Sequence, residues 1–200
     1  MSLFDKQAYD AATVSDGGGN YQKMPAGGYV CAIQAVRTSG MAGGREIDYV
    51  HEKKYVVLIW DIIEGDFAGK YSEDYWTDPA RDYGHRFYLS WKNLGAFKGV
   101  VQCFDESNPG FDAFAAADAE NWGLFVGKKI GFVIGEEEYE ANNGEIKTRY
   151  TLPRAKSVQD IREGKYRVPA LKKLESAPST SPAPAASKPV DTFDDVPFSV

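Results

Sequence analysis

The sequence predicts a mainly β protein with one helical insert and a disordered C-terminal tail. Strand-forming aromatic residues are abundant, with 12 Tyr and 11 Phe among 200 residues. Several segments alternate apolar side chains with a period of two, as strands do. The segment from Ser176 to Pro189 is rich in Ser, Pro and Ala and has little apolar surface to bury. The body ahead of it is long enough for one domain with its own core.

The first half of the chain is expected to supply three strands after a loose, Gly-rich arm over residues 1–24. Tyr29–Arg37 alternates in the manner of a strand, and Ser39–Gly44 is expected to be a flexible hairpin loop. Lys54–Ile63 is the strongest strand signal, and because both of its faces are apolar it predicts a central strand. After a Gly-containing turn, Lys70–Trp76 is expected to form the third strand.

The second half is expected to supply two helices and then two strands. His85–Phe97 carries apolar residues at helical spacing, and Phe111–Trp122 is rich in Ala. Lys129–Tyr139 and Ile146–Leu152 read as strands joined by the Asn-Asn-Gly turn at 142–144. Three strands, a helical insert and two strands is the chain order of a five-stranded oligonucleotide-binding barrel, the OB-fold, with its helix between strands three and four. A small α+β sandwich has the same order.

The net charge of −6 is unevenly distributed along the chain. Residues 1–146 hold 13 basic and 23 acidic side chains, whereas residues 147–173 hold nine basic and two acidic ones. Residues 174–200 are acidic again, with four acids and one Lys. A basic segment in an otherwise acidic chain indicates a surface for an anionic ligand, and a solvated basic face is the alternative.

No catalytic pattern stands out in the sequence. It has no phosphate-binding loop and no Cys-x-x-Cys or Gly-x-Ser-x-Gly motif, and the spacings of Cys31, Cys103, His51 and His85 match no zinc pattern. Glu145-Ile-Lys147 has the Glu-x-Lys form of some metal-dependent nucleases, but no upstream Asp stands on an obvious partner strand. We therefore expect a non-enzymatic protein with no cofactor and no metal, and a metal-dependent nuclease remains an alternative.

Single-strand binding needs basic side chains to contact phosphates and aromatic faces on which bases stack. Both kinds occur around the second and third expected strands, where OB-folds bind their ligands. A further group of basic residues lies on and after the last expected strand. The candidate DNA-binding residues are Lys53, Lys54, Tyr55, Tyr71, Tyr75, Trp76, Lys147, Arg149, Arg154 and Lys156. For each aromatic residue, packing in the core is the alternative.

The tail ends in an acidic and apolar tip over residues 191–200. An acidic tip on a flexible linker, here residues 174–190, is suited to capture by other proteins. The candidate partner-binding residues are Phe193, Asp194, Asp195, Val196, Pro197 and Phe198.

This tip resembles that of the single-stranded DNA-binding proteins of bacteria and their phages, which end in Asp-Asp-x-Pro-Phe. The body resembles a family of phage replication-module proteins predicted to bind single strands, through Met24–Tyr29, Tyr55–Gly69 and Gly127–Pro153. In the bacterial proteins the Phe is the last residue, whereas Ser199 and Val200 follow Phe198 here.

The resemblance implies an OB-fold domain over residues 25–173 that coats single-stranded DNA without sequence preference during phage replication or recombination. The tip would recruit replication or recombination proteins. With no signal peptide and no apolar run that could cross a bilayer, we expect a protein of the cytoplasm, that of the host cell if phage-encoded, with no membrane partner. An interaction adaptor that uses the tail but binds no DNA is the main alternative, and the oligomeric state stays open.

Overall fold

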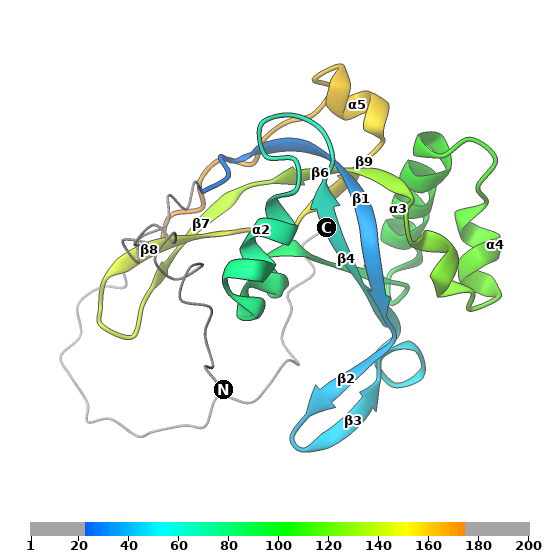
Figure 1. The fold of residues 1–200 in the computed structure, drawn as a ribbon, viewed down its shortest axis with the longest axis horizontal. Coiled ribbons are helices and arrows are strands. Elements are labelled where there is room, and N and C mark those ends of the chain that lie inside the picture. The colour runs from blue at the N-terminus through cyan, green and yellow to red at the C-terminus, as the bar shows by residue number, and fades with distance from the viewer. Residues whose placement is uncertain (1–22, 175–200) are drawn as a thin grey trace, which may run out of the picture.

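The computed structural model describes residues 23–174. Its centre is a curled, five-stranded antiparallel sheet with the strand order β5-β4-β1-β6-β9 (Figure 1). Phe87 of β5 and Phe132 of β6 are separated by two strands in the sheet, yet their rings lie 4.9 Å apart, so the sheet is curled into a half-barrel. The strands are β1 (Gly27–Arg37), β4 (Tyr55–Ile62), β5 (Arg86–Ser90), β6 (Lys129–Ile134) and β9 (Arg154–Lys156).

Two hairpins extend from this sheet, on either side of α2 in Figure 1. The first joins β1 to β4 and consists of β2 (Ser39–Ala42) and β3 (Arg45–Asp48). Its turn is Gly43-Gly44, with φ of 56° and 77°, which side chains other than Gly rarely adopt. The second joins β6 to β9 and consists of β7 (Glu136–Glu140) and β8 (Ile146–Tyr150).

Helical segments cover both faces of the sheet. α3, α4 and η3 contribute buried side chains to the main core, and α5 packs on the opposite face against Val30 and Val133. The segments are η1 (Tyr49–Lys53, a π-helical turn), α2 (Lys70–Thr77), η2 (Pro79–His85, a 3-10 helix), α3 (Leu94–Ser107), α4 (Ala113–Asp118), η3 (Trp122–Phe125) and α5 (Val158–Arg162). No helix among residues 23–174 is long and apolar enough to cross a membrane.

Strand alternation divides the sheet into a core face and an outer face. On β4, Val56, Leu58 and Trp60 belong to the main core cluster. The intervening residues of β4 point to the other side, which we call the outer face. Cross-strand pairing places Arg37 of β1 and Tyr88 of β5 on this face, level with Val57. The outer face of β4 and β5 is where the candidate site lies.

The prediction of a third strand over Lys70–Trp76 is wrong, because this segment is helix α2. Its aromatic residues suggested a strand, but pairs at helical spacing stabilise the helix. Lys70 and Asp74 form an ion pair of 3.0 Å, and the rings of Tyr71 and Tyr75 lie 5.7 Å apart. Gly69, with a φ of 80°, precedes the helix as its N-cap.

The predicted helix over His85–Phe97 is also wrong in its first half. Arg86–Ser90 forms the strand β5, with Phe87 and Leu89 in the core and Tyr88 on the outer face. Apolar residues at helical spacing in this segment led to the helix prediction, although residues 86–90 also alternate with the period of a strand. Helix α3 begins later, at Leu94, where the side chain of Asn93 accepts a hydrogen bond of 3.1 Å from the amide of Ala96.

Other expectations agree with the structure or lie outside it. The fold is mainly β, and α3 and α4 lie between the third and fourth strands of the sheet. The predicted strands at 29–37, 54–63 and 129–139 correspond to β1, to β4, and to β6 with β7. Met24, which we expected in the arm, is buried in the core. The linker and the tip over residues 191–200 fall outside the described residues.

Candidate nucleic-acid interface

Three tyrosine rings form a ladder on the outer face. The rings of Tyr49 and Tyr55 lie 5.0 Å apart, and those of Tyr55 and Tyr88 lie 5.4 Å apart. All three side chains are half-buried, so each packs on its neighbours and keeps some surface in solvent. Aromatic rings held in this way offer faces for stacking of nucleobases.

The first ring of the ladder is held by the β2–β3 hairpin. A side chain at Gly40 would place its Cβ 1.9 Å from the Tyr49 hydroxyl, so Tyr49 packs directly against the backbone of β2. The amide of Tyr49 also donates a hydrogen bond of 2.8 Å to the carbonyl of Thr38. The hairpin therefore fixes one end of the tyrosine ladder.

Two arginines flank the ladder on the same face. Arg37 of β1 and Arg86 of β5 both bind the carboxylate of Asp82 from η2, at 2.7 and 2.6 Å. Asp82 is only 5% exposed, whereas the side chain of Arg37 is 43% exposed. The cluster of two arginines and one aspartate keeps a net positive charge next to the rings.

Lys53 and Lys54 stand at the start of β4, beside the ladder. Lys54 is exposed and has a φ of 57°, a conformation that Lys rarely adopts. Its carbonyl accepts hydrogen bonds of 3.2 Å from the amide of Trp91 and 3.1 Å from the hydroxyl of Ser90. These bonds hold the backbone of Lys54 in its strained conformation, while its side chain is exposed.

Tyr71, Tyr75 and Trp76 lie on α2 instead of a strand. Trp76 is 85% exposed and Tyr75 is 38% exposed. Burial raises the pKa of the Tyr71 hydroxyl, and the nearby carboxylate of Asp82 adds to the increase. Tyr71 therefore lies near Asp82, which the two arginines bind.

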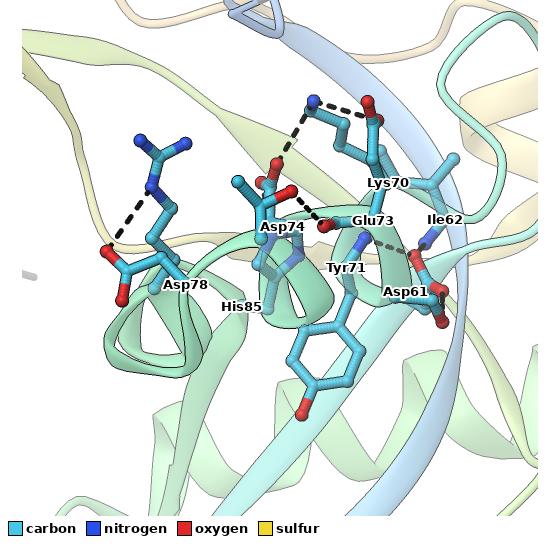
Figure 2. A network of polar contacts seen from close by, with 11 residues as sticks. Asp61, Ile62, Lys70, Tyr71, Glu73, Asp74, Asp78 and His85 are labelled. Carbon is cyan, nitrogen blue, oxygen red and sulfur yellow. Dashed lines mark hydrogen bonds and ion pairs between the residues drawn. The ribbon is translucent and has the colours of Figure 1, made fainter. Parts of the chain in front are cut away.

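A buried polar network anchors α2 to the sheet (Figure 2). Asp61 of β4 accepts hydrogen bonds of 2.8 Å from the amide of Tyr71 and 3.1 Å from the hydroxyl of Ser72. Figure 2 also shows Asp74 between Lys70 and His85, with contacts of 3.0 and 3.1 Å. Burial lowers the pKa of His85, although Asp74 opposes this shift.

The β7–β8 hairpin carries Lys147 and Arg149 on β8. Residues 136–150 hold five glutamates and these two basic residues. Arg149 binds Glu137 at 2.7 Å, and Lys147 binds Glu145 at 3.2 Å. The local charge of the hairpin is therefore negative, although the segment that follows it in the sequence is basic.

Arg154 and Lys156 lie on β9, which ends the sheet opposite to β5 in strand order. They pair with Val133 and Gly131 of β6, and so face the side that α5 covers. The ten predicted DNA-binding residues thus fall on four parts of the fold. The structure brings together only Lys53, Lys54 and Tyr55 beside the ladder, with Tyr71 near Asp82.

The residues considered for metal binding are far from forming one site. His51 contacts Asp48 and Glu120, His85 contacts Asp74, and Cys31 and Cys103 are free thiols. Glu145 and Lys147 pair with each other at the end of the hairpin. Within residues 23–174, no three His, Cys, Asp or Glu side chains are grouped so that they could hold a metal ion.

Sequence reasoning missed Tyr49, Tyr88, Arg37 and Arg86. Tyr88 and Arg86 were assigned to a helix, although the alternation of residues 86–90 is the signal that could have revealed a strand. Arg37 ends the correctly predicted strand β1, but only the register with Val57 shows that it shares a face with Tyr55. Partner-binding residues of the tip lie outside the described chain.

Comparison with known proteins found no matching family model and no match among curated proteins.

Proposed function

We propose that this chain is a non-enzymatic single-stranded DNA-binding protein whose half-barrel is an open form of the OB-fold. In that fold, the first strand pairs with the second and the fourth, and the third and fifth extend the sheet on either side. With β1, β4, β5, β6 and β9 taken as strands one to five, the observed order 3-2-1-4-5 has this connectivity. Helix α3 then lies between strands three and four. The edges of strands three and five remain unpaired with each other.

The observation that carries the proposal is the position of the tyrosine ladder. OB-folds bind oligonucleotides on the face of strands two and three, between the loop that joins strands one and two and the loop that joins strands four and five. Tyr55 and Tyr88 lie on the corresponding strands, β4 and β5. The two hairpins take the place of those loops, so they flank the proposed path of the strand.

The chemistry of this face fits a single strand bound without base preference. Stacking on tyrosine rings tolerates every base, because each base has a π-face. Lys53, Lys54 and Arg37 supply positive charge for phosphates next to the rings. Lys147, Arg149, Arg154 and Lys156 would add weaker contacts at the margins, since two of them are already paired with glutamates.

Titration of a labelled oligonucleotide tests this function. The full chain should bind a single strand much more tightly than a duplex, with a log–log salt slope of about −0.7 for each phosphate contacted. Equal affinity for the duplex, or an affinity that salt does not change, would contradict the proposed mode of binding.

The tip is proposed to recruit replication or recombination proteins. Deletion of residues 191–200 should abolish capture of such partners and leave the affinity for single strands at high salt unchanged. At low salt the deletion should tighten binding modestly, because the three aspartates of residues 191–200 compete with phosphates for the basic surface. Retained partner capture after the deletion would remove the recruitment role.

An interaction adaptor is the second candidate, and the surface of α2 favours it. Trp76 and Tyr83 are 85% and 70% exposed, which is unusual for large aromatic side chains. The exposed carboxylates of Glu73 and Asp78 lie on the same segment and disfavour a polyanion. If the wild-type chain binds no oligonucleotide and Trp76→Ala abolishes capture of a protein partner, the chain is an adaptor and α2 is part of its protein-binding surface.

A further inference from the structure

A carboxylate between two arginines on the outer face has the geometry of a bound phosphate. Asp82 presents one oxygen to Arg37, at 2.7 Å, and the other to Arg86, at 2.6 Å. Guanidinium groups bind carboxylate and phosphate through the same planar arrangement of N–H donors. The two arginines come from β1 and β5, on either side of β4, so it is the sheet that brings them to one anion.

The carboxylate leaves part of this site unsatisfied. The Nε atom of Arg86 is buried and has no hydrogen-bond partner among the residues that the structure describes. Asp82 presents one oxygen to a terminal nitrogen of each arginine and none to this Nε. A backbone phosphate has two charged non-bridging oxygens, as a carboxylate does, but they are held tetrahedrally with two ester oxygens that are weaker acceptors, and a buried N–H without an acceptor is costly. A phosphate that reaches Nε as well as the terminal nitrogens therefore satisfies this site better than Asp82 does.

The site adjoins the tyrosine ladder. Arg37, Val57 and Tyr88 form one row across β1, β4 and β5 on the outer face. Two strand spacings, about 10 Å, separate Arg37 from Tyr88 across this row. Since Tyr55 packs on Tyr88 at 5.4 Å, a strand whose bases stack on these rings passes its phosphates close to the two arginines.

We propose that Asp82 occupies a phosphate site of the interface in the free protein and leaves it when a single strand binds. This inference rests on the proposed function above, and adds that η2 regulates access to the site. η2 is a 3-10 helix with the exposed residues Pro79 and Ala80 at its start. Such helices are less stable than α-helices, so opening between Asp78 and His85 frees the carboxylate without unfolding the sheet.

Two isosteric variants of the full chain test the competition. Asp82→Asn removes the competing charge, and Asp78→Asn removes an equal charge from the same segment. Asp78 contacts Arg81 and caps η2, a role that Asn can keep. With labelled oligothymidylate at low salt, Asp82→Asn should bind about three- to tenfold more tightly than the wild type, and Asp78→Asn within about twofold. Weaker binding by Asp82→Asn would show that Asp82 positions the arginines, and would overturn the competition.

Hydrogen exchange in the wild-type protein provides a test that needs no variant. When oligothymidylate binds, amides of residues 80–85 should exchange faster, while those of β4 and β5 should exchange more slowly. Slower exchange in residues 80–85 would overturn the displacement of η2. These results are distinct from failure of the proposed function, in which the wild type would not bind the oligonucleotide and no segment would change its exchange.

Discussion

The outer face of β4 and β5 and the β7–β8 hairpin both carry residues suited to single strands, but their surroundings differ. On the outer face, the ring of Tyr55 packs against those of Tyr49 and Tyr88, tilted by 30° to the first and edge-to-face with the second, and two arginines share a single carboxylate. On the hairpin, each of the two basic residues has its own glutamate, and further glutamates remain. Charge on a segment of sequence is therefore a poor guide to charge on a surface, because cross-strand pairing decides what is neutralised.

The difference implies an order of importance for binding. Stacking on fixed rings depends little on salt, whereas an exposed ion pair must be broken before either side chain can bind a phosphate. We therefore expect the ladder to contribute most, the lysines beside it less, and the hairpin least.

The largest effect should come from the ladder itself. Replacing Tyr55 and Tyr88 together with Leu keeps apolar volume but removes the ring faces, and should reduce the free energy of binding by about 1–3 kcal/mol for each stack lost. The salt slope should change little, because no charge is removed. Fluorescence anisotropy at several salt concentrations measures both quantities. The matched control is Tyr75→Leu on α2, which should bind like the wild type. A larger loss of affinity in this control than in the double variant would show that α2, and not the tyrosine ladder, provides the main stacking surface.

Removal of Lys54 should have a smaller effect of a different kind. Lys54→Asn removes the charge but tolerates a φ of 57°, so the backbone stays as it is. The salt slope should become shallower by about 0.7, the value for one phosphate contact on a single strand. Lys54→Gly serves as a second variant that relieves the strain and also lacks the charge. If both variants keep the wild-type slope, Lys54 makes no phosphate contact.

The hairpin should matter less than either. Replacing Lys147 and Arg149 with Gln also releases Glu145 and Glu137 from their ion pairs. We expect affinity to fall by less than in Lys54→Asn for each charge removed, because these cations are already paired. Anisotropy under the same conditions measures the effect, and a slope change of a full contact for each residue would place the hairpin in the main path of the strand.

The smallest effect on binding should come from His85, which lies under α2. Its pKa is lowered in the folded protein by burial, so below its unfolded value of about 6.5 the unfolded chain takes up a proton that the native state does not. Stability should therefore fall as the pH drops from about 6.5 toward the folded pKa, and thermal unfolding at a series of pH values measures this.

Two variants test whether His85 causes this loss of stability in acid. His85→Gln should remove this part of the pH dependence, with a smaller change in affinity at pH 7.5 than the variants above. His51 is the opposite case, since hydrogen bonding to Asp48 raises its pKa, and its contribution is lost as the pH rises. If His51→Gln instead removes the loss of stability in acid, the assignment to His85 is incorrect.

Much of the sheet could be predicted from sequence, and less of the site. The alternation in Tyr55–Ile62 is long and apolar, so it identified the central strand correctly. The helix over residues 70–77 was predicted as a strand, and the strand over residues 86–90 was predicted as part of a helix. Short segments with aromatic residues fit both periods. Arg37 lies 45 residues before Asp82 in the sequence. Only the register of β1, β4 and β5 shows that Arg37 and Arg86 share a face and can bind the same carboxylate. The pairing of Arg149 with Glu137 likewise needs the hairpin register, whereas Lys147 pairs with Glu145 two residues before it.

Photochemical crosslinking of the full chain to a single-stranded oligothymidylate, with the linked peptides identified by mass spectrometry, tests the central claim most directly. We expect crosslinks at Tyr55 and Tyr88, with Tyr49 as the next site, and their loss when unlabelled single strand is in excess. Crosslinks confined to Trp76 of α2 and Tyr83 of η2, or to the β7–β8 hairpin, would contradict the assignment of the outer face of β4 and β5 as the DNA-binding surface.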